Sequence, residues 1–195
     1  FCAGADLSRG AEVFARSADE FSACPISPPA WQIRKPVIAA VNGHAIGVGM
    51  TIALHCDIRV MARAAKYGIV QVRRGVMPDA FSHWTLPRIA GLGVAADLLL
   101  TGRTFDGDEA LRLGIASRVV DASDVLPLAH SIADDIAVNT NPLSVSVSKR
   151  LLWQSFEARA SEVGDEETRL HRILMGSPDS REGVEAFLAR RTPLW

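Results

Sequence analysis

The feature that most constrains this chain is a short apolar run followed at once by a glycine-rich turn. The run, Val37–Val41, consists of small and β-branched residues, which is the pattern of a strand buried on both faces. The turn covers residues 42–49 and leads into an expected helix over Met50–His55. Asp57–Met61 again has the pattern of a strand. Strand, helix and strand in this order form a βαβ unit, so we predict a parallel sheet.

The segment before this unit is rich in helix breakers. We expect a short helix after Ala5 and then a loop, because Pro28 and Pro29 are incompatible with a helix interior. One or two further helical turns should end at Lys35, since the residue before a proline disfavours the helical conformation.

The segment after the unit alternates helix signals with turns. We expect apolar helices at Trp84–Ile89 and Ala95–Leu100. A further helix should be capped by Asp106 and end at Gly114 in the left-handed conformation. Ser117–Asp121 should close this part of the chain as a short strand.

The chain changes character after about residue 122. We therefore divide it into an α/β core over residues 1–122 and an all-helical region over residues 123–195. The second region holds four stretches with helical spacing of apolar residues: Asp124–Val138, Pro142–Trp153, Ala158–Met175 and Asp179–Arg191.

Composition excludes several classes of protein. The 21 Lys and Arg residues balance 22 Asp and Glu residues, which argues against a strongly basic nucleic-acid binder. The apolar runs are far shorter than the roughly 20 residues that span a bilayer, so no membrane partner is expected. Three widely spaced cysteines argue against a disulfide framework and for a reducing, cytoplasmic compartment. Because the chain starts without Met or a signal-like stretch, we expect it to be the interior of a longer product.

The motif Gly47-Val48-Gly49 permits three interpretations. It lacks the third glycine of a dinucleotide-binding loop, and Gln71 stands where an acidic residue would hold the ribose. It could be a tight turn without function. The interpretation we favour is a set of backbone N–H groups at a helix start, placed to stabilise a developing negative charge.

Other candidate constellations are weak. Asp79, Ser82 and His83 are too close in sequence to arrange a nucleophile, base and orienting group in line. The five histidines show no metal-ligand spacing, so no metal is expected. Two arginine pairs, Arg73-Arg74 and Arg190-Arg191, could be solvated surface or could capture phosphate, and their spacing does not decide between these.

Five motifs in the right order carry a family resemblance that covers essentially the whole chain. The two most specific are Phe1–Leu7 (FCAGADL) and Lys35–Gly49 (KPVIAAVNGHAIGVG). The others are Cys56–Arg59, Gly75–Asp79 and Asp179–Phe187. Together they resemble the crotonase (enoyl-CoA hydratase/isomerase) superfamily. The family's amino-terminal segment has no counterpart here, so we expect an uncovered strand edge and poor independent solubility.

The resemblance implies a fold, a substrate and an assembly. The fold would be an α/β spiral of ββα turns, followed by a helical carboxy-terminal segment that packs between subunits. The assembly would be a homotrimer or a dimer of trimers. The substrate would be an acyl-CoA thioester, with no other cofactor.

The resemblance also implies site residues. The backbone N–H groups of Ala5 and Val48 would form an oxyanion hole for the thioester oxygen. Substrate and CoA contacts are expected from the following set: Ala3, Ala5, Asp6, Leu7, Ser8, Val48, Thr51, Gln71, Phe187, Arg190 and Arg191.

Departures from the family pattern bear on the reaction. A hydratase of this family uses two glutamates, and their positions here hold Thr51 and Gln71. Neither side chain titrates near neutral pH, so neither can transfer protons as a carboxylate does. The resemblance therefore disfavours ordinary hydration, although both residues could hold a water or a polar substrate group.

One carboxylate remains in the corresponding loop. Asp79 falls where some isomerases of the family carry a catalytic aspartate, but it could instead cap the following helix. Met77, Phe81 and Trp84 are expected to surround it with apolar surface. We expect an acyl-CoA double-bond isomerase in which Asp79 shuttles the proton. The alternatives are a residual hydratase or CoA-thioester hydrolase, and an inactive acyl-CoA-binding scaffold.

Overall fold

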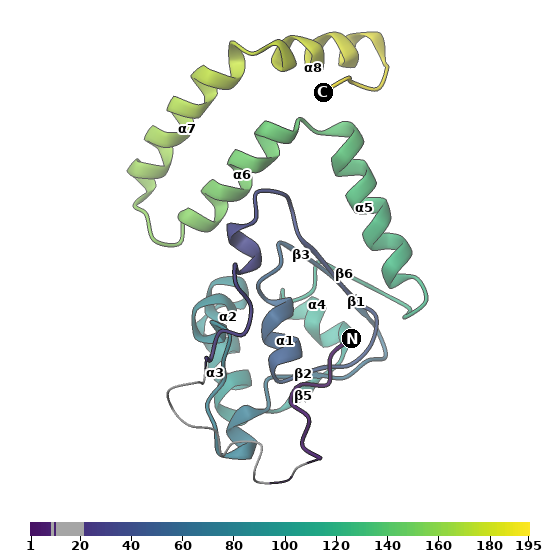
Figure 1. Ribbon diagram of the computed structural model, residues 1–195, viewed down its shortest axis with the longest axis vertical. Helices are drawn as coiled ribbons and strands as arrows, with labels where there is room; N and C mark the ends of the chain where they lie inside the picture. The colour runs from purple at the N-terminus through teal and green to yellow at the C-terminus, as the bar shows by residue number, and fades with distance from the viewer. Residues whose placement is uncertain (9, 11–21) are drawn as a thin grey trace. The chain divides into compact units, whose positions relative to one another are not determined.

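The computed structural model describes residues 1–8, 10 and 22–195 (Figure 1). The helix expected after Ala5 falls mainly outside the described residues. The chain forms two compact units, and each is described by itself. The first comprises Phe1–Ala30 and Ile38–Ala129, and the second comprises Trp31–Val37 and His130–Trp195.

A parallel sheet of three strands organises the first unit. Its order is β1 (Ile38–Val41), β3 (Ile58–Ala62) and β6 (Arg118–Val120). Ala40 pairs with Val60 in parallel register, which confirms the predicted βαβ unit. Burial differs between the strands. The central strand β3 is buried at four of five positions, whereas β1, paired among the described residues with β3 alone, alternates between half-buried and buried. The prediction that Val37–Val41 is buried on both faces is therefore wrong.

A second small sheet joins the start of the chain to the glycine-rich turn. It consists of β2 (Ala45–Ile46), β4 (Tyr67–Gly68) and β5 (Thr104–Phe105). Cys2 forms a parallel bridge with Ala45 and accepts a 3.0 Å hydrogen bond from the Ile46 N–H. The amino-terminal segment consequently runs directly beside the turn that precedes the first helix.

The helices of the first unit start and end close to the expected positions. They are α1 (Val48–Ala53), α2 (Ser82–Ala90), α3 (Leu92–Thr101) and α4 (Gly107–Arg112), with a 3-10 turn η4 (Gln71–Arg74) before α2. The Asp106 side chain caps α4 by accepting a hydrogen bond from the Glu109 N–H, and Gly114 follows with φ +73°. Both predictions for this helix are confirmed.

The second unit contains the four helices expected after residue 122, the first of which begins in the first unit. They are α5 (Val125–Asn139), α6 (Pro142–Gln154), α7 (Ala160–Met175) and α8 (Pro178–Ala189). Asn141 and Ser177 cap α6 and α8, and each is followed by a proline at the first helical position. A short 3-10 turn, η3 (Ala30–Gln32), lies where the chain passes in sequence from the first unit to the second. Among the described residues, none of the helices has the length and apolar character needed to cross a bilayer.

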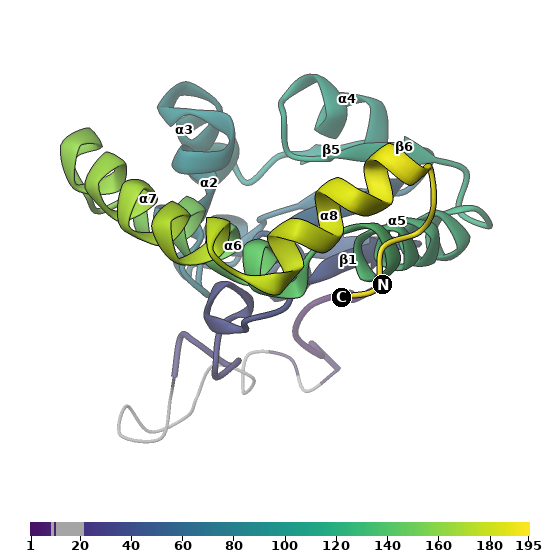
Figure 2. The ribbon, with the colours of Figure 1, turned by 90° about the horizontal axis from the view of Figure 1, so that it is seen from above.

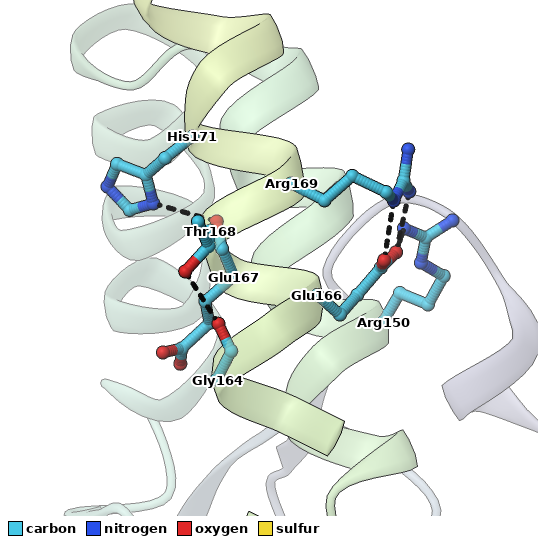
Figure 3. A network of polar contacts seen from close by, with 7 residues as sticks. All are labelled: Arg150, Gly164, Glu166, Glu167, Thr168, Arg169 and His171. Carbon is cyan, nitrogen blue, oxygen red and sulfur yellow. Dashed lines mark hydrogen bonds and ion pairs between the residues drawn. The ribbon is translucent and has the colours of Figure 1, made fainter. Parts of the chain in front are cut away.

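Helices α6 and α7 lie side by side in the second unit (Figures 1 and 2). Glu166 of α7 pairs with Arg150 of α6 at 3.2 Å and accepts hydrogen bonds of 2.6 and 2.7 Å from Arg169, one turn along α7. Figure 3 shows these contacts. The Arg169 guanidinium lowers the pKa of Glu166. Trp153 of α6 also packs against Trp31 in a tilted arrangement, with ring centroids 5.4 Å apart. Packing and charge pairing thus act together in this unit.

The loop that enters α2 is held in an unusual conformation. Ala80 and Phe81 have φ values of +47° and +57°, which are costly for residues with a Cβ. Two contacts fix this conformation. The Ala80 N–H donates to Ala23 O at 2.8 Å, and Nε2 of the buried His55 lies 2.7 Å from Ala80 O. Because a carbonyl only accepts, Nε2 of His55 carries the proton in this bond.

The close approach of Cys2 to α1 predicts a large difference between two glycine substitutions. A Cβ on Gly49 would lie 2.3 Å from Cys2 O, whereas a Cβ on Gly93 would meet nothing within 4 Å. We expect Gly49→Ala to lower the free energy of unfolding by about 1–3 kcal/mol or more. Gly93→Ala should leave it unchanged or raise it slightly. Chemical denaturation measures both, and equal losses would contradict the contact.

The buried His55 predicts a pH dependence of stability. Burial lowers its pKa below the ordinary 6.5, against the opposing effects of the Ala80 hydrogen bond and the Asp79 charge. Below pH 6.5 the unfolded chain therefore binds a proton at His55 more readily than the folded chain does. The contribution of the neutral, buried ring to the free energy of unfolding is complete above pH 6.5 and declines as the pH falls below it. Between pH 7.5 and 5, we expect the parent to lose more unfolding free energy than His55→Gln. Parallel stability curves for the two proteins would refute this role.

Candidate functional site

Three side chains from separate elements of the first unit meet at one carboxylate oxygen. Asp79 Oδ1 accepts a 3.0 Å hydrogen bond from Thr51 Oγ1 and another of 3.0 Å from Gln71 Nε2. Thr51 lies on α1 and is fully buried, Gln71 begins η4 and is 9% exposed, and Asp79 in the following loop is half-buried. The positions that sequence analysis singled out separately thus form one cluster.

The second oxygen of Asp79 is differently placed. No described residue forms a hydrogen bond with Oδ2. The N-cap position of α2 is occupied by Phe81, without a side-chain cap, and Asp79 contacts Ser82 only through its backbone oxygen at 3.0 Å. The interpretation of Asp79 as the helix cap is therefore wrong, because tertiary hydrogen bonds hold its side chain away from the helix end.

Local geometry explains why the cluster forms. Thr51 is on the first turn of α1, which begins directly after Gly47 with φ +58°. The Gln71 side chain lies under that turn, since a Cβ on Gly47 would be 3.8 Å from Gln71 Nε2. Gly75, in the left-handed conformation, ends η4 and turns the chain towards Asp79.

The two predicted oxyanion donors come from adjacent stretches of chain. Val48 is the first residue of α1, and neither its N–H nor that of Ala5 donates a hydrogen bond to any described residue. Gly4, with φ +87°, lies so close to the turn that a Cβ would be 2.7 Å from Ile46 O and 3.9 Å from Gly47 Cα. The residue before Ala5 thus approaches the residue before Val48, and both amides belong to one region of the first unit.

The remaining amino-terminal candidates lie at the surface. Ala3, Asp6, Leu7 and Ser8 are exposed. Asp6 Oδ1 accepts a 2.9 Å hydrogen bond from the Ser8 N–H, and this bond lowers the pKa of Asp6. These side chains are therefore accessible to a ligand that approaches the Ala5 amide.

The apolar surroundings expected for Asp79 are only partly present. Trp84 is half-buried, but Met77 is 71% exposed and Phe81 is 39% exposed. The Phe81 ring turns towards His55, with centroids 5.7 Å apart. The expectation that Met77 and Phe81 enclose Asp79 is wrong, because both side chains leave much of their surface to solvent.

Three candidates belong to the second unit. Phe187 on α8 is 81% exposed, and Arg190 ends that helix with φ +52°. Arg191 binds Glu182 through two hydrogen bonds of 2.5 and 2.8 Å, and this pairing lowers the pKa of Glu182 to about 2. A phosphate group at Arg191 would have to compete with Glu182, whereas Arg190 carries no such pairing among the described contacts.

Sequence reasoning missed the part that His55 plays. The sequence assigned no role to this histidine beyond excluding a metal site, yet it anchors the loop that carries Asp79 through its bond to Ala80 O. The only sequence signal for this role is a polar residue placed where α1 ends. Arg73 and Arg74, considered for phosphate capture, bond to the carbonyl oxygens of Thr101 and Arg73.

Comparison with known proteins identifies the family. The family model for enoyl-CoA hydratase/isomerase matches residues 1–195. A probable enoyl-CoA hydratase of Mycobacterium leprae is 38% identical, with 99% of this chain and 75% of the relative covered. The enoyl-CoA hydratase ACTT3 of Alternaria alternata is 36% identical over 99% of this chain, which spans 66% of that relative.

Solved structures give the same result. The crystal structure of a probable enoyl-CoA hydratase/isomerase from Mycobacterium abscessus has a TM-score of 0.88 and 52% identity, covering 90% of this chain and 71% of that one. An enoyl-CoA hydratase from Bacillus anthracis has a TM-score of 0.81 and 32% identity, covering 85% and 64%. The chain has the crotonase-like α/β fold and belongs to the enoyl-CoA hydratase/isomerase family, the crotonase superfamily.

Proposed function

We propose that the protein moves the double bond of an acyl-CoA thioester, with Asp79 as the group that transfers the proton. The observation that carries this proposal is the placement of Asp79. One of its oxygens is held by Thr51 and Gln71, and the other is left without a partner among the described residues. A fixed carboxylate with one available oxygen suits a base that must meet a carbon acid in a defined geometry.

The expected reaction balances with this single base. Asp79 Oδ2 takes a proton from the carbon next to the thioester, and the electron pair of the broken C–H bond moves into an enolate. The amides of Ala5 and Val48 would bind the enolate oxygen, where a single lost donor costs about 3–4 kcal/mol in a well-studied oxyanion hole. The same proton is then returned to the γ-carbon, so the double bond moves and no atom is gained or lost.

Two alternatives remain. One is hydration, which the named hydratases among the relatives favour, or hydrolysis of the thioester. In either reaction Gln71 would hold the water, since its buried Oε1 has no hydrogen-bond partner among the described residues. The other alternative is an acyl-CoA-binding scaffold without turnover. Oxygen-18 from solvent water in the product would favour hydration or hydrolysis, and binding without any turnover would favour the scaffold.

Substitution of the carboxylate tests the proposed chemistry. Asp79→Asn keeps the size and most polar contacts of the side chain but removes its basic oxygen, so we expect isomerisation of 3-enoyl-CoA to slow by about 10²–10⁴-fold. The rise in conjugated-thioester absorbance measures the rate. Asp97→Asn, a surface carboxylate paired with Arg103, is the matched control and should retain the parent rate. An Asp79→Asn protein as fast as the parent would remove this mechanism.

We also propose that copies of the chain assemble in the cytoplasm as a homotrimer or a dimer of trimers. The support is a group of strongly exposed apolar residues near the carboxy terminus: Met175, Phe187, Leu188 and Leu194, which are 73–81% exposed. Arg190 and Phe187 could then contact the CoA of a neighbouring subunit. Analytical ultracentrifugation should give a mass three or six times that of the chain, and Phe187→Asp should reduce it. A monomer at all concentrations would refute the assembly.

A further inference from the structure

We propose that Thr51 and Gln71 are positioning residues that hold Asp79 by Oδ1 throughout the reaction, so that only Oδ2 takes up and returns the proton. The proposal rests on the proposed function of Asp79 and adds a role for two residues that cannot themselves act as acid or base. It also names the oxygen that reacts.

The number of donors at Oδ1 supports this assignment. A carboxylate oxygen has two lone pairs. At Asp79 Oδ1, one faces the hydroxyl of Thr51 and the other faces the amide of Gln71, each at 3.0 Å. Since both lone pairs are used, an incoming proton is directed to Oδ2.

The same contacts remain satisfied after the proton is transferred. When Oδ2 carries the proton, Oδ1 becomes the carbonyl oxygen of a neutral acid and can still accept from both donors. The side chain of Asp79 therefore need not reorient between taking the proton from one carbon and giving it to another. A site that needs no reorganisation between the two steps lowers the barrier to both.

The burial of the donors makes them rigid and selective. Thr51 is fully buried, and its hydroxyl lies 3.0 Å from Asp79 Oδ1 and 3.1 Å from Val48 O. The hydroxyl has a single hydrogen, which goes to the carboxylate because a charged acceptor forms the stronger hydrogen bond. A glutamate at either position would be an acceptor when ionised and would repel the carboxylate of Asp79. Threonine and glutamine instead supply neutral donors, so these residue types fit a site with one shuttling acid.

The charges around Asp79 are consistent with neutral donors. His55, which follows α1, is a titratable group that interacts with the charge of Asp79, and burial lowers the pKa of His55 and so favours the neutral ring. On η4 the charged side chains, Arg73 and Arg74, are exposed. Thr51 and Gln71 are therefore the groups that decide how Asp79 is held.

The carbon-13 chemical shift of the Asp79 carboxyl in the full protein tests the proposal without relying on turnover. The resonance is assigned by its loss in Asp79→Asn. Thr51→Val removes one donor while keeping the shape of the side chain, and we expect the resonance to move because Oδ1 then accepts one hydrogen bond fewer. Thr51→Ser should restore it. Thr85→Val, which removes another fully buried threonine hydroxyl bonded to a backbone carbonyl, should leave it unchanged.

Kinetics on the same variants give the second readout. We expect kcat for isomerisation to fall about tenfold in Thr51→Val and in Gln71→Met, with KM little changed. The serine variant should recover the parent kcat. If one variant does not fold, the other still decides the outcome.

The failures of the two proposals are distinguishable. An unchanged Asp79 resonance and an unchanged kcat in Thr51→Val and Gln71→Met, with Asp79→Asn inactive, would overturn the positioning role and leave the proposed function standing. A parent protein without isomerase activity whose Asp79 resonance still moves in Thr51→Val would instead refute the function. Movement of the resonance by Thr85→Val to the same extent would show a general effect of lost hydroxyls and would overturn the positioning role.

Discussion

The hydrogen bonds from Thr51 and Gln71 to a single oxygen of Asp79 are the interaction on which the site depends. They join α1, η4 and the loop before α2, three elements of the first unit. A hydrogen bond to a charged group contributes more than one between neutral groups, about 1.5–3 kcal/mol. The pair therefore fixes the loop and, by the same contacts, leaves the second oxygen of Asp79 available.

The loop conformation has a cost that its surroundings offset. Two successive residues with side chains, Ala80 and Phe81, adopt left-handed backbone angles. Such conformations cost roughly 1–2 kcal/mol per residue and persist where neighbouring contacts determine them. Here the bonds from His55 and to Ala23 supply those contacts. The strain is thus located beside the carboxylate, as is common near functional sites.

Sequence patterns predict the secondary structure of this protein well because its signals are local. The apolar run at Val37–Val41, the cap at Asp106 and the prolines that begin α6 and α8 each act within a few residues of chain. The burial of β1 was less predictable, because burial depends on how many strands lie beside it rather than on its own residues.

The site itself could be predicted only in part. The motifs identify Thr51, Gln71 and Asp79 singly, but the contact between Thr51 and Asp79 joins residues 28 positions apart. Locally, Asp79 fits a helix cap as well as a base, and only the tertiary hydrogen bonds decide between them. Nothing in the residue types of Ala80 and Phe81 indicates a left-handed backbone.

A crystal structure with an unreactive acyl-CoA analogue tests the central claim most directly. The account predicts that the thioester oxygen lies on the amides of Ala5 and Val48. Asp79 Oδ2 should then stand about 3–3.5 Å from both the α- and the γ-carbon. A thioester oxygen bound elsewhere, or a different side chain between those two carbons, would contradict it.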